Sequence, residues 1–341
     1  MLDDLKYIHE KDGQDALGFA EKQWQQIAQN FDVPVQKGEF DNIVFAGMGG
    51  SALAALISAS WPGYYVPFEI VRNYSLPAYV SGKTLFIASS YSGNTEETLS
   101  ALEAAEQKGA KIAVITSGGQ LGDIAKNKSY STALLPRGFQ PRYATLYNLK
   151  AIISLLDACG ITSGKVAELE GQEGFLKQSV AGWLPTIPAD QNLAKKIARE
   201  LMGKSVVIYS GPGLFPAAYK WKISVNENAK QIAWTGQLPE ADHNEILGWT
   251  QQPGQKPYAV VDIRSSLDHS RIQKRFEITE RLLSGRRPAP IVIKPEGQTL
   301  LQQLLWTIAL GDFVSLYLAL LNGLNPTPVE LIEKLKTALK E

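Results

Sequence analysis

A cluster of small hydroxyl side chains follows an apolar run that is typical of a buried strand. The segment SSYSGNTEET, residues 89–98, comes directly after KTLFIA and is here called the hydroxyl loop. Within seven positions it places four hydroxyl residues, which are Ser89, Ser90, Ser92 and Thr95. A plain turn or a helix cap needs one or two such residues, whereas phosphate oxygens accept many hydrogen bonds. We therefore expect the hydroxyl loop to bind a phosphate group, with a plain turn as the alternative.

A glycine-rich segment, GMGGS at residues 47–51, joins an earlier strand-like run to a helix of small residues. Glycines let the backbone approach a ligand closely, and the start of a helix offers unpaired N–H groups to an anion. The segment lacks the G-x-G-x-x-G spacing of a dinucleotide site, and no G-K-S/T follows it as in a P-loop. The pattern therefore indicates a partner for the hydroxyl loop in anion binding.

Strand-like and helix-like runs alternate along the chain and must position these loops. The strand-like runs of the first half are residues 42–46, 67–73, 84–90, 111–119 and 131–136. Helices are expected between them, which indicates βαβ units and a parallel sheet. The pattern restarts at residue 204, with later strands in YAVVDIR and APIVIKP. Because IVFAGMGGSALAA and VVIYSGPGLFPAA look like copies of one opening unit, the sequence predicts two similar domains.

The expected fold class is α/β, with each domain a parallel sheet flanked by helices in a flavodoxin-like, doubly wound arrangement. Helical arms are expected at both termini, and residues 3–30 are predicted to form a helix. The expected ranges are an N-terminal arm at 1–35, a first domain at 36–160, a helical connector at 161–195, a second domain at 196–322 and a C-terminal tail helix at 323–341.

Composition and charge exclude several classes of function. The formal net charge of the 341 residues is zero, so we expect neither a nucleic-acid partner nor an acidic membrane surface. The single cysteine, Cys159, excludes an internal disulfide framework, and its apolar surroundings indicate a buried, inert thiol. The N-terminus is charged, and the most apolar stretch, LLWTIALGDFVSLYLALLNGL, carries Asp312 in its middle. These features predict a cytoplasmic protein in which that stretch is a core or interface helix.

The two loops, in this order, resemble the sugar isomerase (SIS) domain, a phosphosugar-binding module. Four further motifs extend the likeness: GFQPRYA (138–144), NENAK (226–230), LPEADHNEI (238–246) and NPTPVELIEKLK (325–336). With them, nearly the whole chain resembles the bifunctional phosphoglucose/phosphomannose isomerase family. The resemblance implies two SIS domains and a cofactor-free enzyme of carbohydrate metabolism. This enzyme would interconvert glucose 6-phosphate, and with it mannose 6-phosphate, with fructose 6-phosphate through a cis-enediol.

The resemblance also implies roles for individual residues. Five of them would hold the substrate phosphate: Gly50, Ser51, Ser90, Ser92 and Thr95. Glu227 would be the base that moves a proton between C2 and C1, and His243 the acid that opens the sugar ring. Arg142 would stabilise the negative charge of the enediolate, and Lys336 would close over the site from the tail. The implied assembly is a homodimer in which His243 reaches the sugar bound to the neighbouring chain.

Some of these residues have simpler interpretations. Glu227 could be a solvated helix carboxylate and Lys336 a solvated lysine of an amphipathic terminal helix. Arg137 lies close to Arg142 in sequence, but the Pro-Arg pair favours Arg142. One tail position departs from the family pattern, because Val329 stands where family members carry a threonine that is linked to acceptance of both C2 epimers. This departure weakens the expectation of mannose activity more than that of glucose activity.

A metal site built from Asp242, His243 and Glu245 is a further alternative. These residues are too close in sequence to converge easily, and the H-E-x-x-H pattern is absent, so we expect no metal. Other functions on the same fold are a non-catalytic sugar-phosphate sensor and a ketose-phosphate aminotransferase. A sensor usually carries a DNA-binding helical domain and a basic face, whereas the aminotransferase needs a reactive N-terminal cysteine, a role that Cys159 cannot fill.

Overall fold

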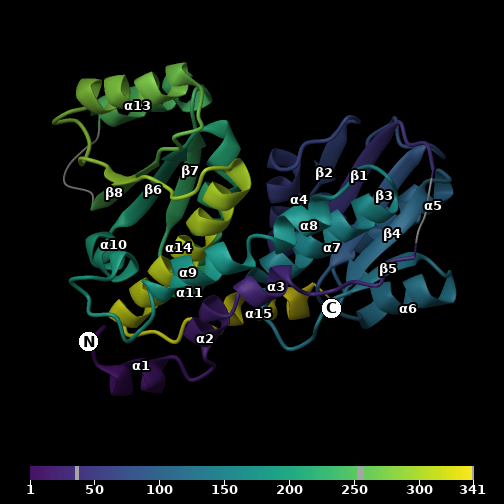
Figure 1. The fold of residues 1–341 in the computed structure, drawn as a ribbon, viewed down its shortest axis with the longest axis horizontal. Helices are drawn as coiled ribbons and strands as arrows, with labels where there is room; N and C mark the ends of the chain where they lie inside the picture. The colour runs from purple at the N-terminus through teal and green to yellow at the C-terminus, as the bar shows by residue number, and fades with distance from the viewer. Residues whose placement is uncertain (35–37, 252–256, 340–341) are drawn as a thin grey trace. The chain divides into compact units, whose positions relative to one another are not determined.

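The computed structural model describes residues 1–34, 38–251 and 257–339, and these form two compact units (Figure 1). One unit, here called the N-module, consists of Gln23–Gly174. The other, the C-module, consists of Phe175–Glu341 together with the first residues of the chain, Met1–Lys22. The expected boundary at residues 35 and 36 and the last two residues of the expected tail lie outside the described residues.

The N-module is built on a five-stranded sheet in which all neighbouring strands are parallel. The strand order β2-β1-β3-β4-β5 is that of a flavodoxin-like, doubly wound sheet, which confirms the expected fold class. The strands are β1 (Asn42–Gly47), β2 (Phe68–Val71), β3 (Thr84–Ser90), β4 (Lys111–Thr116) and β5 (Ser131–Leu134).

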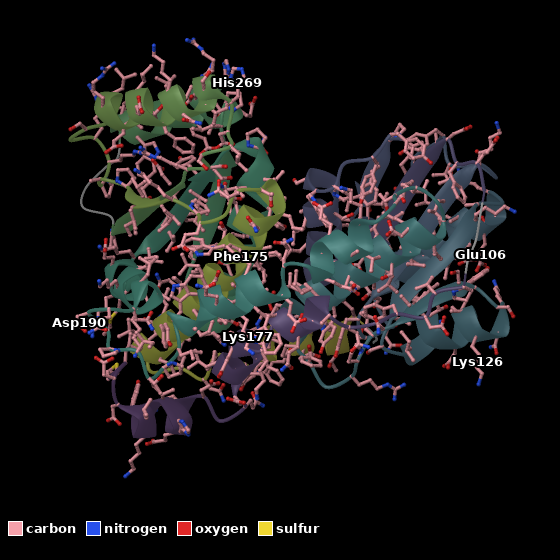
Figure 2. All side chains as sticks on the ribbon, viewed as in Figure 1. Glu106, Lys126, Phe175, Lys177, Asp190 and His269 are labelled. Atoms are coloured by element: carbon pink, nitrogen blue, oxygen red, sulfur yellow. The ribbon has the colours of Figure 1, made fainter. Side chains whose placement is uncertain are left out.

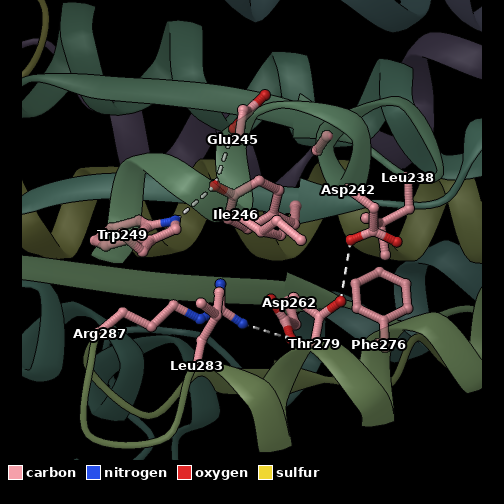
Figure 3. A pocket seen from close by; sticks show the side chains of 12 residues that line it. Leu238, Asp242, Glu245, Ile246, Trp249, Asp262, Phe276, Thr279, Leu283 and Arg287 are labelled. Atoms are coloured by element: carbon pink, nitrogen blue, oxygen red, sulfur yellow. Dashed lines mark hydrogen bonds and ion pairs between the residues drawn. The ribbon is translucent and has the colours of Figure 1, made fainter. Parts of the chain in front are cut away.

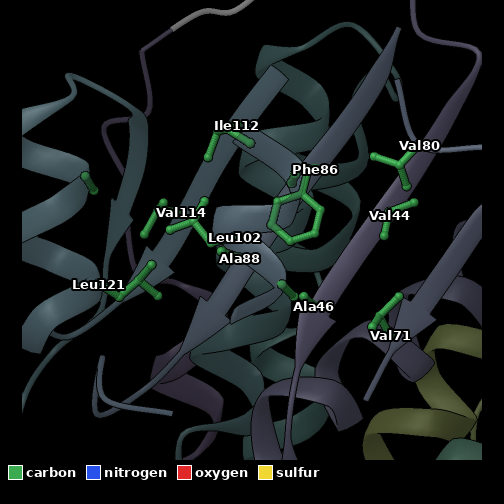
Figure 4. Close-up of a cluster of buried hydrophobic side chains, with 13 residues drawn as sticks. Val44, Ala46, Val71, Val80, Phe86, Ala88, Leu102, Ile112, Val114 and Leu121 are labelled. Carbon is green, nitrogen blue, oxygen red and sulfur yellow. The ribbon is translucent and has the colours of Figure 1, made fainter. Parts of the chain in front are cut away.

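Helices cover this sheet on both faces, so its central strands are apolar along their whole length, as parallel strands usually are. Val44, Phe86 and Val114 point to one face and pack with Leu102 and Leu121 in a buried cluster (Figure 4). On the other side of the sheet, α4 packs against α7. The helices of the N-module are α3 (Trp24–Ile27), α4 (Gly49–Ser60), α5 (Glu96–Gln107), α6 (Gly119–Asn127), α7 (Thr145–Ala158) and α8 (Lys165–Glu170), with a 3₁₀ helix at Pro141–Tyr143.

The C-module repeats this plan with four parallel strands in the order β7-β6-β8-β9. Its strands are β6 (Ser205–Ser210), β7 (Ala233–Gln237), β8 (Tyr258–Ile263) and β9 (Ile291–Ile293). Its helices are α1 (Leu5–Lys11), α2 (Ala16–Glu21), α10 (Leu193–Leu201), α11 (Phe215–Ala229), α12 (Glu245–Gly248), α13 (Ser270–Leu282), α14 (Leu300–Leu321) and α15 (Glu330–Ala338). The remaining helix, α9 (Glu173–Ala181), begins in the N-module and continues into the C-module.

The single helix expected over residues 3–30 is wrong, because this stretch forms the three short helices α1, α2 and α3. The carboxylate of Asp12 accepts the N–H groups of Ala16 and Leu17, both at 2.8 Å. The Asp12 side chain therefore holds the N–H groups at the start of α2, and α1 ends at the residue before Asp12.

Helix α14 is a core helix, as its sequence predicted. It is long and apolar enough to cross a membrane, but 94% of its most apolar window is buried inside the structure. It packs against α11, α10 and α2. Its one charged residue, Asp312, forms an ion pair with the buried Lys220 of α11 and accepts a hydrogen bond from Ser224 at 3.0 Å. The charge that interrupts the apolar stretch is thus neutralised inside the module.

Candidate active site

The hydroxyl loop lies between β3 and α5 in the N-module. The Oγ of Ser90 is 2.7 Å from the Oγ1 of Thr95 and accepts the N–H of Gly93 at 3.1 Å. Ser92 is exposed, and its Oγ accepts the N–H of Asn94 at 3.3 Å. The loop therefore closes on itself through its own hydroxyl groups and holds Thr95 at the first residue before α5.

A capping role does not explain the hydroxyl of Thr95. Thr95 occupies the N-cap position of α5, but its side chain caps none of the helix N–H groups. The first turn of α5 carries Glu96 and Glu97, so its attraction for an anion comes from main-chain amides and the helix dipole. This helix start can donate to a phosphate together with the neighbouring hydroxyls.

The first turn of α6, which follows β4, holds the hydroxyl loop in place. The N–H of Leu121 donates to the carbonyl of Gly93 at 2.8 Å, and the N–H of Gln120 donates to Oδ1 of Asn94 at 3.1 Å. Gly93 has a positive φ of 73°, and a methyl group there would overlap the carbonyl oxygen of Gly118. The Gly-Asn pair thus fixes the shape of the loop together with the hydroxyl contacts.

The GMGGS segment lies at the same edge, because Gly47 at the end of β1 pairs with Ser89 at the end of β3. Helix α4 starts at Gly49, inside the glycine-rich segment, so Gly50 and Ser51 belong to its first turn. A methyl group at Gly50 would lie 2.7 Å from the carbonyl oxygen of Pro141. Only a glycine allows this close approach between α4 and the GFQPRYA motif.

Arg142 is almost completely buried in the 3₁₀ helix of that motif, with 2% of its surface exposed. Its guanidinium carbon lies 4.6 Å from the ring centre of Tyr143, and Nη2 donates to the Tyr143 hydroxyl at 3.3 Å. Arg137 is exposed and donates from Nε to the carbonyl of Ser117 at 2.8 Å. The structure thus brings Arg142 close to Gly50, at the carboxyl edge of the sheet, where open α/β sheets bind ligands.

Glu227, the expected base, lies on α11 of the C-module and is partly buried. The residues on either side of it are fixed: Asn226 accepts the N–H of Ala233 at 2.9 Å, and Asn228 donates to Ser315 of α14 at 2.9 Å. Glu227 therefore lies on a firmly packed helix.

His243 is exposed at the end of a 3₁₀ helix, Glu240–His243, and the two acids near it point elsewhere. Asp242 binds Arg275 and Thr279, and Glu245 accepts the hydroxyl of Tyr209. In the described ranges, no three His, Cys, Asp or Glu side chains are grouped so that they could hold a metal ion.

The remaining candidate residues are Lys336, Val329 and Cys159. Lys336 is exposed on α15, and its Nζ lies 2.8 Å from Oε1 of Glu333. Val329 occupies the position just before α15. Cys159 is buried, and burial raises the pKa of its thiol to about 11, which confirms the expectation of an inert thiol.

The loop after β8 is the counterpart of the hydroxyl loop in the C-module. Ser210 of β6 pairs with Ile263 as Gly47 pairs with Ser89. His269 precedes α13 (Figure 2), and Thr95 precedes α5 in the same way. The two loops have equal length in the sequence, RSSLDH against SYSGNT. The hydroxyl positions of Ser90 and Thr95 are therefore taken by Arg264 and His269.

The counterpart loop also carries a carboxylate that sequence reasoning missed. The side chain of Asp268 lies against Gly211, where a methyl group would overlap it. Burial raises the pKa of Asp268, and a hydrogen bond from the amide of Ser265 partly offsets this. Asp268 thus lies at the edge of the C-module sheet. It lies between the loop after β6, which corresponds to GMGGS, and the loop after β8, which corresponds to the hydroxyl loop. An alignment of the two loops would have revealed it.

Comparisons with known proteins agree with this duplicated architecture. The SIS domain family matches residues 39–159, and the family described as bacterial phospho-glucose isomerase C-terminal SIS domain matches residues 190–339. The chain is 37% identical to a bifunctional phosphoglucose/phosphomannose isomerase of Caldicellulosiruptor bescii over 93% of this chain and 94% of that protein. The like-named protein of Aquifex aeolicus is 35% identical over 94% and 95% of the two chains.

Two further proteins are similar to this chain. A D-glucosamine-6-phosphate 4-epimerase of Sulfolobus acidocaldarius is 30% identical over 92% of this chain and 94% of that protein. The crystal structure of a glucose-6-phosphate isomerase like protein from Thermus thermophilus superimposes with a TM-score of 0.67 at 18% identity, covering 98% of each chain. The last similarity concerns the fold alone.

Proposed function

Because the chain belongs to the bifunctional phosphoglucose/phosphomannose isomerase family, we propose that it interconverts glucose 6-phosphate and mannose 6-phosphate with fructose 6-phosphate. The observation that carries this proposal is the edge of the N-module sheet, where the hydroxyl loop, the start of α4 and Arg142 lie together. Hydroxyl and amide donors suit a phosphate, and a permanently charged guanidinium suits a developing oxyanion.

The proposed reaction begins with ring opening. His243 donates a proton to the ring oxygen as the bond between C1 and that oxygen breaks, while the C1 hydroxyl loses its proton to solvent and becomes the aldehyde carbonyl; Lys336 assists this step. Glu227 then removes the proton from C2, which leaves a cis-enediolate whose charge Arg142 stabilises. A proton then moves from the C2 hydroxyl to the C1 oxygen, and return of the first proton from Glu227 to C1 gives fructose 6-phosphate with its carbonyl at C2. Glucose and mannose 6-phosphates yield the same enediol because C2 becomes trigonal, so a single set of groups can process both.

Five residues would anchor the phosphate in this scheme: Gly50, Ser51, Ser90, Ser92 and Thr95. We further propose a homodimer in which His243 serves the site of the partner chain, and a location in the cytoplasm. A two-fold assembly of this kind would contain two equivalent sites. The proposed chemistry uses side chains alone and needs neither a metal nor a cofactor.

A second candidate is epimerisation at C4 of an amino sugar phosphate, which the similarity to the Sulfolobus acidocaldarius epimerase favours. Both candidate reactions need a phosphate anchor. They differ in the carbons that react, which are C1 and C2 in the isomerisation and C4 in the epimerisation. Val329 bears on which sugar phosphates are accepted, because it stands where the family pattern has a threonine.

The test is a coupled assay for fructose 6-phosphate with glucose 6-phosphate and mannose 6-phosphate, alongside NMR of glucosamine 6-phosphate. We expect fructose 6-phosphate from both hexose phosphates, and its loss in Glu227→Gln. Glu200→Gln, on the exposed side of α10, is the matched control. Binding without turnover would favour a non-catalytic sugar-phosphate protein. Inversion at C4 without formation of fructose 6-phosphate would favour the epimerase.

A further inference from the structure

The short segment that carries His243 is fixed to α13 by the residue just before it. Oδ2 of Asp242 lies 3.0 Å from Nη1 of Arg275. Oδ1 accepts the hydroxyl of Thr279 at 3.0 Å (Figure 3). The Asp242 side chain is 9% exposed. Both of its oxygens are therefore directed into the module, whereas His243 faces outward.

A second carboxylate fixes the other side of the same segment. Oε2 of Glu245 accepts the hydroxyl of Tyr209 at 2.9 Å, and the same hydroxyl accepts Nε1–H of Trp249 at 3.2 Å (Figure 3). Tyr209 belongs to β6, in the centre of the sheet, and burial raises its pKa. The phenol thus stays protonated and keeps donating to Glu245 at neutral pH.

Such anchors are needed because the segment has little stability of its own. The 3₁₀ helix that ends at His243 has four residues, and α12, which follows it, also has four. Helices of this length do not persist in water without tertiary contacts. Without contacts on both sides, the exposed imidazole would sample many orientations.

We propose that Asp242 and Glu245 are positioning residues for His243, a proposal that rests on the function proposed above for this histidine. Asp242 ties its N-terminal side to α13, and Glu245 ties its C-terminal side to β6. Asp242 and Glu245, which together with His243 formed the alternative metal site, thus act through the histidine between them. Since displacing a catalytic group by about 1 Å can cost about a hundredfold in rate, loss of the Asp242 anchor should lower kcat by about 10- to 100-fold.

A pair of substitutions at Thr279 isolates the anchor with little change in volume. Thr279→Val removes the hydroxyl that Asp242 accepts, whereas Thr279→Ser keeps it. We expect Thr279→Val to lower kcat in the same direction as Asp242→Ala and Thr279→Ser to stay near wild type. Glu240→Ala is a control that removes a carboxylate from the same 3₁₀ helix, where Oε1 of Glu240 accepts a hydrogen bond from the exposed Asn244 at 3.1 Å. It should retain activity within about twofold, and inhibition by inorganic phosphate should be unchanged in all four variants.

A double-mutant cycle separates positioning from general destabilisation. If Asp242 acts through His243, Asp242→Ala should have little further effect in the His243→Ala background. An equal loss in both backgrounds would mean a structural role and overturn the inference. If His243→Ala itself keeps full activity, the role proposed for the histidine fails, whatever Asp242 does.

A spectroscopic readout decides the matter even if His243→Ala is too slow to measure. The chain has three histidines, so the imidazole Cε1–H signal of His243 can be assigned by its loss in His243→Ala. We expect this signal to shift or broaden in Asp242→Ala, Glu245→Ala and Thr279→Val, while the other two histidine signals and the Thr279→Ser spectrum stay unchanged. An unchanged His243 signal in the first three variants would overturn the inference.

Discussion

Replacing Ser92 by alanine tests whether the hydroxyl loop binds the phosphate of the substrate. In the structure, Ser92 is exposed and its Oγ accepts one N–H, that of Asn94, at 3.3 Å. That contact uses a lone pair of the oxygen and leaves its proton available to a phosphate oxygen. The substitution therefore removes one hydrogen bond to a charged group together with the Asn94 contact, while the contacts of Ser90 with Thr95 and Gly93 still close the loop.

The expected loss follows from the strength of such a bond. A hydrogen bond to a charged group contributes about 1.5–3 kcal/mol. At about 1.4 kcal/mol for each factor of ten, affinity for the phosphate should fall by about 10- to 150-fold. Ser90→Ala should cost at least as much, because Ser90 also holds Thr95 and Gly93.

The assay is the dissociation constant for inorganic phosphate together with KM for glucose 6-phosphate. Ser100→Ala is the matched control, since this hydroxyl lies on α5 and donates to the carbonyl of Tyr74 at 3.1 Å. Both constants should rise in Ser92→Ala and stay at the wild-type value in Ser100→Ala. Unchanged phosphate affinity in Ser92→Ala and Ser90→Ala would refute the assignment of the loop.

Three further outcomes are expected. Glu227→Gln should lower kcat by about 100- to 10,000-fold, the usual contribution of a general base, with sugar-phosphate binding retained; more than a tenth of wild-type turnover would contradict the assignment. Exchange of subunits between Glu227→Gln and His243→Ala proteins should restore roughly a quarter of wild-type activity, because half of the random dimers are mixed and each has one intact site; no recovery after verified exchange would exclude shared sites. Lys220→Met should destabilise the protein by about 3–5 kcal/mol in urea unfolding, since it leaves the Asp312 carboxylate buried without its cation, whereas Lys220→Met with Asp312→Leu should cost less.

The elements that depend on local pattern could be predicted from the sequence. The strands β1, β3 and β4 are continuous apolar runs, so their burial and parallel order follow from composition and spacing. Strand β7 was not predicted, because the segment AWTGQ contains glycine and glutamine and lies at the edge of its sheet. Its strand conformation comes from pairing with β6 rather than from its own residues.

The candidate site shows the same division between local and distant causes. The hydroxyl loop could be recognised because its donors lie within a few residues of one another. The anchors of the His243 segment could not, because Asp242 meets Arg275 and Thr279 at separations of 33 and 37 residues. The need for glycine at position 50 likewise depends on the carbonyl of Pro141, which only the folded chain brings near.

The equal length of the hydroxyl loop and its C-module counterpart has a consequence for how this chain can change. An insertion or deletion would shift the register of a strand or the start of a helix, whereas these two loops span the same number of residues and differ in their side chains and in the positive φ of Gly93, which Leu267 does not share. Point substitutions alone, at positions such as those of Arg264, Asp268 and His269, were therefore enough to make the loop edge of the C-module sheet differ from that of the N-module sheet. The same route is open in reverse, so a laboratory could graft the hydroxyl pattern onto the second edge by substitution and leave both sheets untouched.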